Sequence, residues 1–287
     1  MQEIKQLTVL NETELAAIAK LADVCNQHDG IRLKLNWEFL QQRKGERTDD
    51  FLFYLDGELI GSLHVYEFNK REVEISGMVH PDHRRNGVFR QLYALAEESI
   101  RQRGIPNVIL IVNHESAGGQ SFSEASGAAY SFSEFQMELN FAKAVPPATD
   151  RIQLREAVYE DRFLLNRLTS EGFGIPLDTM RELTPDQFES GGEGRYLAEL
   201  DGKVIGKIGT FNDPECGLIF GFVVDQQHQG RGYGREILCK TIQRMIADNY
   251  RAVELEVAAK NEGALGLYLS CGFEVVRRMD YYVKALS

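Results

Sequence analysis

The sequence lacks several features that would place it in a specialised class of protein. No apolar run approaches the roughly 20 residues of a membrane-spanning helix, so no membrane segment is expected. The four cysteines form no CxxC pair and the first residues contain no apolar signal core, which predicts a cytoplasmic protein with reduced thiols. The six histidines are scattered along the chain, and no metal site is expected.

Positive charge is also in short supply. The chain has 32 Lys and Arg against 43 Asp and Glu, which gives a net charge of −11. Because binding to nucleic-acid phosphates requires clustered cations, this balance argues against a nucleic-acid partner. The same balance is compatible with a cationic or amine substrate.

What the sequence does contain is one long internal repeat, with an offset of 145 residues that separates Gly87 from Gly232. The clearest matches pair residues 56–61 with 201–206, 84–89 with 229–234, and 108–112 with 253–257. This period is much longer than the roughly 20 to 50 residues of solenoid repeats. We therefore predict two copies of one domain.

The paired prolines Pro146 and Pro147 mark the best boundary, because proline removes a backbone donor and favours an extended chain. We predict an N-terminal domain at residues 1–145 and a C-terminal domain at residues 150–287, each long enough to bury a core. The second half reads as strands at 151–157, 196–200, 203–208, 217–224, 253–257 and 275–283, with helices at 160–172, up to about 249, and at 262–270. This order predicts an α+β fold with a mixed, mostly antiparallel sheet in each copy.

A glycine-rich loop, Gln229-Gly-Arg-Gly-Tyr-Gly234, follows a predicted strand and precedes a predicted helix. Such a loop presents backbone N–H groups at a helix N-terminus, where they attract phosphate. The plainer interpretation is a tight turn from strand to helix. Two other phosphate motifs are excluded, because no GxxxxGK[ST] follows a strand and GxGxxG would need glycine at Arg235.

Together with Asn261, Ala264, Tyr268 and the Gly272-Phe273 pair, this loop resembles the GNAT family of acetyl-CoA-dependent N-acetyltransferases. The resemblance spans nearly all of residues 151–287. It implies that Tyr268 protonates the departing CoA thiolate; the alternative is an amphipathic core tyrosine. It also implies a set of acetyl-CoA contacts at Val223, Val224, Gln229, Gly230, Arg231, Gly232, Tyr233, Gly234, Arg235 and Asn261.

The first copy matches the family less well. Phe89 stands where the signature has Gly or Ala, while Ser116 and Ser123 stand opposite Asn261 and Tyr268. The resemblance therefore implies an auxiliary first domain without the thiolate acid. If that domain keeps a CoA site, its contacts are expected at Met78, Val79, Arg84, Arg85, Asn86, Gly87 and Val88. For the two arginines, an ordinary role as solvated loop charges is an equal alternative.

The general base is harder to assign. Glu74 lies on the fourth strand of the first copy, where some GNAT enzymes carry a catalytic carboxylate, but its counterpart in the second copy is Ile219. In the second copy, Glu254 and Glu256 share one face of the fifth strand, and either could act through water. We take Glu256 and Glu74 as the candidates, with a solvent-facing strand residue as the plainer interpretation of each.

The expected protein is thus a tandem N-acetyltransferase that transfers an acetyl group from acetyl-CoA to a primary amine of a small molecule or peptide. Its working site is expected in the C-terminal half, with the acceptor contacted by loops such as residues 171–193. A non-catalytic acyl-CoA sensor and an acyltransferase for longer acyl chains are the alternatives. We expect a monomer whose domains pair within the chain, or a homodimer.

Overall fold

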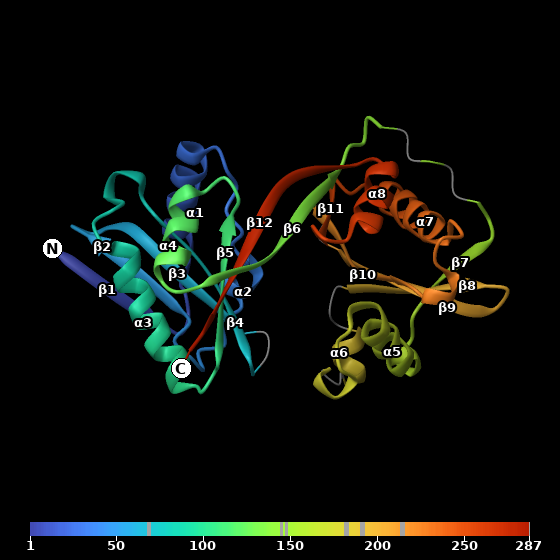
Figure 1. The fold of residues 1–287 in the computed structure, drawn as a ribbon, viewed down its shortest axis with the longest axis horizontal. Helices are drawn as coiled ribbons and strands as arrows, with labels where there is room; N and C mark the ends of the chain where they lie inside the picture. Colours follow the sequence, from blue (N-terminus) through green and yellow to red (C-terminus); the bar gives the residue numbers. More distant parts are fainter. Residues whose placement is uncertain are drawn as a thin grey trace. The chain divides into compact units, whose positions relative to one another are not determined.

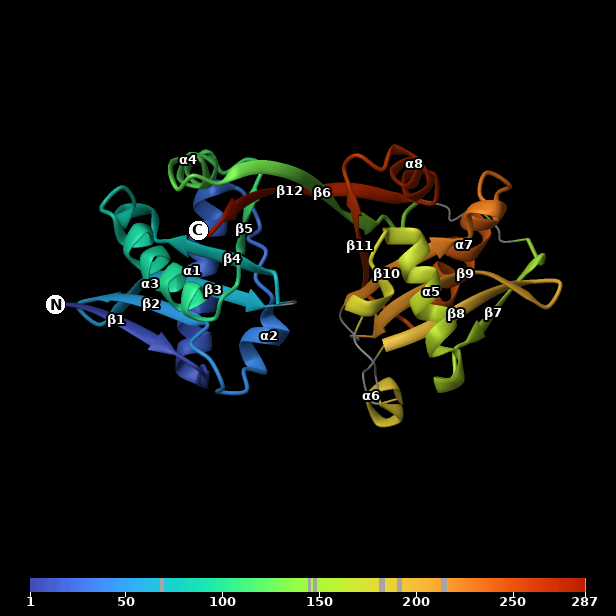
Figure 2. The same ribbon diagram turned by 60° about the horizontal axis from the view of Figure 1, so that its bottom comes forward.

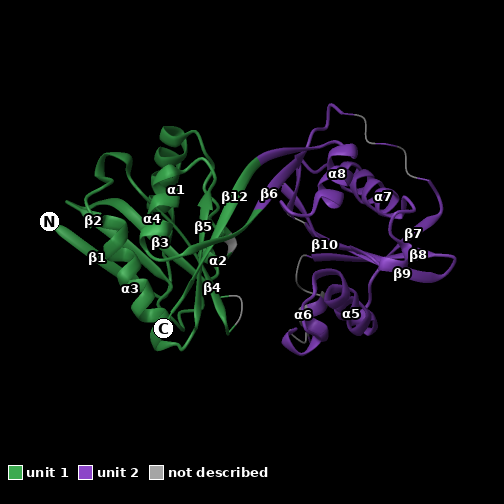
Figure 3. Ribbon diagram, in the orientation of Figure 1, with its two compact units in different colours: residues 1–133, 277–287 green, residues 134–276 purple. Residues whose placement is uncertain are grey.

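A computed structural model describes residues 1–67, 70–143, 146, 149–180, 184–189, 193–212 and 216–286 (Figure 1). The chain divides into two compact units (Figure 3). The first unit comprises residues 1–133 and 277–287, and the second comprises residues 134–276. Among the described helices, none combines the length and the apolar character that crossing a membrane would require.

The first unit is built on a mixed sheet. Its strands, in spatial order, are β1 (Gln2–Leu7), β2 (Asp50–Leu55), β3 (Glu58–Glu67), β4 (Glu72–Val79), β5 (Asn107–Asn113) and the end of β12 (Phe273–Ala285). All neighbours are antiparallel except β4 and β5, which are parallel. Its helices are α1 (Glu12–Asp29), α2 (Trp37–Gln41), α3 (Val88–Gln102) and α4 (Ala117–Ala125).

Helices cover this sheet because each presents one apolar face. Helix α1 begins with a capping box between Asn11 and Glu14 and buries Ile18 and Leu21 against Met78 of β4. Helix α3 buries a separate stripe that packs on a different core cluster, with Leu92, Ala96 and Ile100 fully buried. The sheet of the first unit is thereby buried by two distinct apolar cores.

The second unit repeats this plan. Its sheet has the order β7 (Ile152–Glu156), β8 (Glu193–Leu200), β9 (Lys203–Asn212), β10 (Cys216–Val224), β11 (Ala252–Ala258) and the end of β6 (Ala129–Leu139). Helices α7 (Tyr233–Ala247) and α8 (Glu262–Ser270) lie on one face, and α5 (Arg162–Phe173) and α6 (Pro185–Glu189) lie on the other (Figure 1). Again one neighbouring pair, β10 and β11, is parallel.

The two units exchange strands. Strand β6 starts in the first unit, but its residues 134–138 pair with β11 of the second. Strand β12 starts in the second unit, and its residues 279–285 pair with β5 of the first. These are the strands that pass between the units in Figure 2. Each sheet is therefore completed by residues that the sequence repeat assigns to the other copy.

The duplicated α+β fold is confirmed. Both predicted Asp-Gly hairpins are present, with positive φ at Asp56, Gly57, Asp201 and Gly202. Helix α7 ends at Ala247, two residues earlier than predicted, and Asn249 turns the chain with φ of +62°. The boundary between residues 145 and 150 stays a prediction, because residues 144, 145, 147 and 148 lie outside the described part of the chain.

Candidate acyl-transfer site

The glycine-rich loop of the second unit is held in shape by its own side chains. Asp225 accepts a hydrogen bond from the Gln227 N–H (3.0 Å), and Gln229 Nε2 donates to the Val224 carbonyl (2.9 Å). Gly230 and Gly232 have φ of +73° and +83°, a region that side-chain-bearing residues rarely adopt. These hydrogen bonds stabilise the loop and do not involve the backbone N–H groups of residues 233–235 that follow it.

Those amides belong to the N-terminus of α7, which begins directly after Gly232. The first intrahelical bond runs from the Glu236 N–H to the Gly232 carbonyl (3.2 Å), so the N–H groups of residues 233–235 precede the helical ladder. The ideal Cβ position of Gly230 has no neighbour within 4 Å, and that of Gly232 meets only the Arg151 side chain, at 3.7 Å. The loop thus combines oriented donors with open space, as an anion site requires.

Beside this loop, strand β10 separates from β11. Their parallel pairing runs from Cys216–Ala252 to Ile219–Leu255. Strand β10 then bulges between Phe220 and Val223, with Gly221 at φ of +56°. Val223 and Val224 continue to pair with β9. Their other edge lies beyond the last described pair with β11, where a ligand's amides could take the place of a strand.

Helix α8 supplies the remaining predicted residues. The Asn261 side chain caps this helix by accepting from the Ala264 N–H (3.1 Å), so Asn261 has a structural role in the helix itself. The Tyr268 ring is buried in the core that α7 and β11 also line, 6.1 Å from the Phe273 ring. Burial raises the pKa of Tyr268 to about 12, which keeps its hydroxyl protonated at neutral pH.

The candidate bases lie apart from Tyr268. On β11, Val253, Leu255 and Val257 point into the Tyr268 core, so Glu254 and Glu256 project from the opposite face. Glu254 accepts a hydrogen bond from Gln136 of β6, and Glu256 is exposed. Glu74 is half-buried on β4 of the first unit, directly across from Tyr66. The structure therefore does not bring Glu74 and Tyr268 into one unit.

The first unit repeats the backbone of the loop on a different sequence. Gly87 caps α3 with φ and ψ of 78° and 6°, close to the 83° and −1° of Gly232. Arg84 and Gln229 share φ and ψ of −67° and 159°. Arg85 adopts φ of +65° where the second copy has a glycine. The loop conformation is thus retained although two glycines are missing.

Arg84 is committed to other partners in this loop. Its guanidinium donates to both carboxylate oxygens of Asp29 (2.8 and 2.7 Å) and to the Val79 carbonyl (3.0 Å). The hydrogen bond from Arg84 is the main reason that the pKa of Asp29 is lowered. Arg84 therefore fastens the loop to the end of α1, much as Gln229 fastens its own loop to Val224.

Phe89 and Gly234 show how the two copies fill the same space. The Phe89 ring lies over Gly77 of β4, so that a Cβ on Gly77 would stand 2.8 Å from it, and it meets the Phe122 ring edge-on at 4.7 Å. In the second copy the ring comes from the strand as Phe222, and its tip lies 3.7 Å from the Cβ position of Gly234. The ring between strand and helix thus comes from helix α3 in the first unit and from strand β10 in the second.

The position that corresponds to Tyr268 in the first unit holds a serine, Ser123. Ser116 caps α4 as Asn261 caps α8, accepting from the Gly119 N–H (3.3 Å). Ser123, which corresponds to Tyr268 in the sequence repeat, is fully buried and donates a hydrogen bond to the Gly119 carbonyl (3.0 Å). Its hydroxyl proton is therefore already used within α4.

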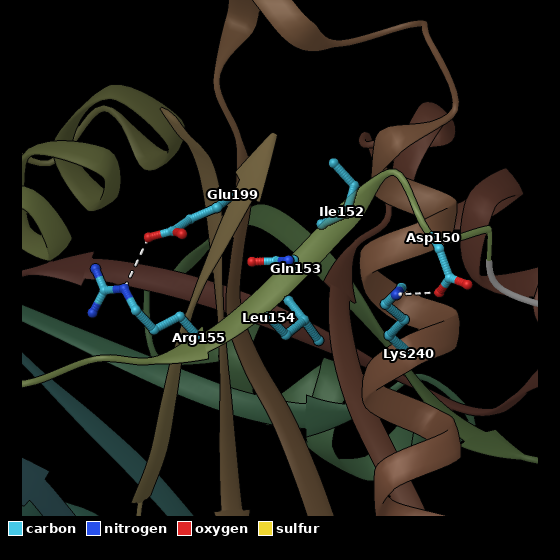
Figure 4. Close-up of a pocket in the computed structure, with 7 residues that line it drawn as sticks. All are labelled: Asp150, Ile152, Gln153, Leu154, Arg155, Glu199 and Lys240. Carbon is cyan, nitrogen blue, oxygen red and sulfur yellow. Dashed lines mark hydrogen bonds and ion pairs between the residues drawn. The ribbon is translucent and has the colours of Figure 1, made fainter. Parts of the chain in front are cut away.

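A surface cavity of about 630 Å³ lies elsewhere in the second unit, at its edge strand (Figure 4). It is lined by Asp150, Ile152, Gln153, Leu154, Arg155, Glu199 and Lys240. Its charges are paired internally, with Lys240 at 3.2 Å from Asp150 and Arg155 at 2.8 Å from Glu199. No residue of the loop or of α8 lines it, so we assign it no part in the site.

One charged residue near the site, Lys207, belongs to no sequence motif and is therefore not among the predicted site residues. It lies on β9 opposite Val223, and its Nζ donates to Thr169 Oγ1 on α5 (2.5 Å). Burial, aided by the nearby charge of Arg195, lowers the pKa of Lys207 to about 8. The available signal was a single lysine within the apolar strand pattern of residues 204–211.

Comparison with known proteins agrees with this geometry. Residues 16–127 and 162–273 each match the family model for the acetyltransferase (GNAT) family. The chain is 27% identical over 279 residues to a mycothiol acetyltransferase of Thermomonospora curvata, covering 92% of this chain and 91% of the relative.

Two solved structures share the whole fold. A GCN5-related N-acetyltransferase from Sphaerobacter thermophilus superposes with a TM-score of 0.83 at 22% identity, covering 99% of this chain and 95% of the other. A tandem GNAT protein from the clavulanic acid biosynthesis pathway gives a TM-score of 0.74 at 18% identity, covering 99% and 98%. At these identities the likeness establishes the fold.

Proposed function

This chain belongs to the acetyltransferase (GNAT) family, and we propose that its second unit transfers an acetyl group from acetyl-CoA to a primary amine. The observation that carries the proposal is the convergence of three features in one unit. These are an open loop at the N-terminus of α7, a strand β10 that leaves β11, and a buried, protonated Tyr268 on α8.

In this proposal the loop and the strand end hold acetyl-CoA. The pyrophosphate would be bound by amides at the start of α7, aided by the positive end of the helix dipole. The pantetheine amides would pair with the free edge of Val223 and Val224. The full set of proposed contacts is Val223, Val224, Gln229, Gly230, Arg231, Gly232, Tyr233, Gly234, Arg235 and Asn261.

The chemistry is an exchange of one acyl bond for another. A base removes a proton from the acceptor, and the neutral amine attacks the thioester carbon. A backbone N–H near Val224 stabilises the resulting oxyanion. The C–N bond forms in this attack, and the C–S bond of the intermediate then breaks as Tyr268 gives its proton to the departing thiolate. The nitrogen releases its surplus proton to solvent, from which Tyr268 is reprotonated. Glu256, acting through water, is the proposed base of this unit.

The first unit would act as an auxiliary domain. Its loop keeps the backbone of a phosphate site, which supports weak CoA contacts at Met78, Val79, Arg84, Arg85, Asn86, Gly87 and Val88. Because Arg84 is hydrogen-bonded to Asp29 and Ser123 to Gly119, we propose neither strong phosphate binding nor protonation of a thiolate there. Glu74 is the only proposed catalytic group of this unit.

Turnover decides between this proposal and its alternatives. The protein is incubated with acetyl-CoA and a panel of primary amines, and released thiol is compared with acetylated amine. One mole of each per turnover is the expected result. Binding of acetyl-CoA without thiol release would indicate a sensor. Faster turnover with longer acyl-CoA than with acetyl-CoA would indicate a different acyl donor.

A further inference from the structure

The face of the second unit that carries α5 holds a cation at the point where β10 bulges. Lys207 points to this face, because its partner Val223 contacts Gly172 of α5. Its Nζ lies 3.5 Å from the Cβ position of Gly221, the bulge residue with positive φ. The ammonium group therefore stands beside the strand end at which the acyl group is proposed to bind.

This ammonium group has a hydroxyl partner and no carboxylate among the residues that the structure describes. Thr169, which accepts from Nζ, donates its own proton to the Leu165 carbonyl (2.8 Å). Arg195 on the adjacent strand β8 adds a second positive charge, and its own counter-ion is Glu193 (2.5 Å). A buried charge without an opposite charge is unfavourable, which agrees with the lowered pKa of Lys207.

In the first unit, the charges at the corresponding position are paired with one another. At the offset of 145, Lys207 corresponds to Ser62 and Arg195 to Asp50. Asp50 is bonded to Arg43 (2.9 and 3.0 Å) and to His64 (2.9 Å), whose other ring nitrogen meets Ser62 Oγ (3.2 Å). All of these charges are balanced inside the protein. Among the described residues of the second unit, no carboxylate balances the positive charge of Lys207 on the corresponding face.

We propose that Lys207 binds a carboxylate of the acceptor, so that the acceptor is an amino acid or a similar molecule with a carboxylate near its primary amine. This inference rests on the proposed function of the second unit. An acceptor carboxylate on Nζ would supply the missing negative charge and hold the amine beside β10. Because the carboxylate is held on Nζ and the amine lies close to it in the same molecule, the bound carboxylate orients the amine toward the thioester carbon.

The test compares acceptors that differ only in this charge. Amino acids and their carboxamides are assayed in pairs with the wild-type chain, with Lys207→Met, and with Lys203→Met as the matched control on the exposed start of β9. We expect the wild-type preference for carboxylates to fall in Lys207→Met, through KM, by on the order of 10- to 100-fold, the factor of one charge-assisted hydrogen bond. Carboxamide turnover and acetyl-CoA affinity should stay within about twofold, and Lys203→Met should behave as wild type.

An equal loss of kcat for both members of each pair would overturn the inference, because it would make Lys207 a base or an oxyanion ligand while leaving the acetyltransferase function intact. If the wild-type chain turns over no amine, the proposed function fails, and binding still tests Lys207. Calorimetry with N-acetyl amino acids should then show binding to the wild type and not to Lys207→Met. Equal affinity in the two proteins contradicts the inference.

Discussion

Tyr268 combines a buried ring with a hydroxyl that no described residue engages. Changing it to phenylalanine keeps the ring in the core and removes only the hydroxyl, which is the proposed proton donor. We expect kcat to fall by roughly 10²- to 10⁴-fold, the range of a general acid, which equals about 3 to 5 kcal/mol. Acetyl-CoA affinity should hardly change. Thiol release with an accepted amine and calorimetry with acetyl-CoA measure the two quantities.

The matched control is Ser123→Ala in the first unit, which removes a hydroxyl that is bonded within α4. Turnover should stay near the wild-type rate, with a stability loss of about 1 kcal/mol. Similar losses of kcat at Ser123 and Tyr268, or no loss at Tyr268, would show that the proton comes from elsewhere.

Lys207 also predicts how stability depends on pH. The pKa of Lys207 is about 8 in the folded chain against the ordinary 10.5 of a lysine, so between these pH values the unfolded chain holds more protons. The charged lysine thus destabilises the fold below pH 8, and this penalty disappears as the pH rises toward 10.5. We expect Lys207→Met to be more stable than wild type by about 1 to 3 kcal/mol at pH 7, with a smaller difference at pH 10. Urea unfolding at both pH values gives this difference, and a pH-independent value would contradict the lowered pKa.

At the scale of elements, the loops that precede α3 and α7 show that different sequences can adopt the same backbone conformation. Gly232 is the glycine that both loops keep, as Gly87 in the first unit, and its φ is +83°. Gly232→Val should strain this loop, displace the amides of α7 and abolish several charge-assisted bonds to phosphate, each worth about 1.5 to 3 kcal/mol. Calorimetry with CoA should therefore show a loss of at least tenfold in affinity.

Gly202→Val supplies the control, because Gly202 has a similar φ of +76° but lies in the turn between β8 and β9, outside the loop. It introduces a comparable backbone strain without touching the phosphate site. Unchanged CoA affinity in Gly232→Val, or an equal loss in Gly202→Val, would speak against the assigned site.

The exchanged aromatic rings give a second prediction for these elements. Gly234→Phe would place a ring on α7 against Phe222, whose ring tip lies 3.7 Å from the Cβ position of Gly234. The single substitution should destabilise the second unit by about 1 to 3 kcal/mol through overpacking, and adding Phe222→Ala should recover part of this loss. Denaturant midpoints of the four proteins give the coupling energy. Strictly additive effects would mean that the two positions do not share one space.

The sequence predicts local features of this fold well, because turns, caps and periodicity act over a few residues. The Asp56-Gly57 hairpin and helix α8 are present where the pattern places them. The exchange of β6 and β12 has no local signal, since a strand's period does not say which neighbour it pairs with. Likewise the bond from Arg84 to Asp29 joins residues 55 positions apart, and the charge imbalance at Lys207 becomes visible only when its neighbours are known.

At the scale of the whole molecule, the strand exchange predicts where the chain can be divided. A fragment of residues 148–287 lacks the part of β6 that pairs with β11 and leaves residues 279–285 without β5. It should be poorly soluble or inactive, because it exposes an unpaired sheet edge and a loose apolar strand. A fragment of residues 134–276, which matches the compact unit, should instead be monodisperse. Size-exclusion chromatography compares the two, and a well-behaved 148–287 fragment with full activity would contradict this account.

The strand exchange also sets an order of events during synthesis. Residues 279–285 are synthesised after the rest of the second copy, yet they form a strand of the sheet to which residues 2–7 belong. The first sheet therefore waits, one strand short, until the second copy has been made. A chain that stops before residue 279 cannot complete the first sheet, so interrupted translation should yield products that proteases readily recognise and remove.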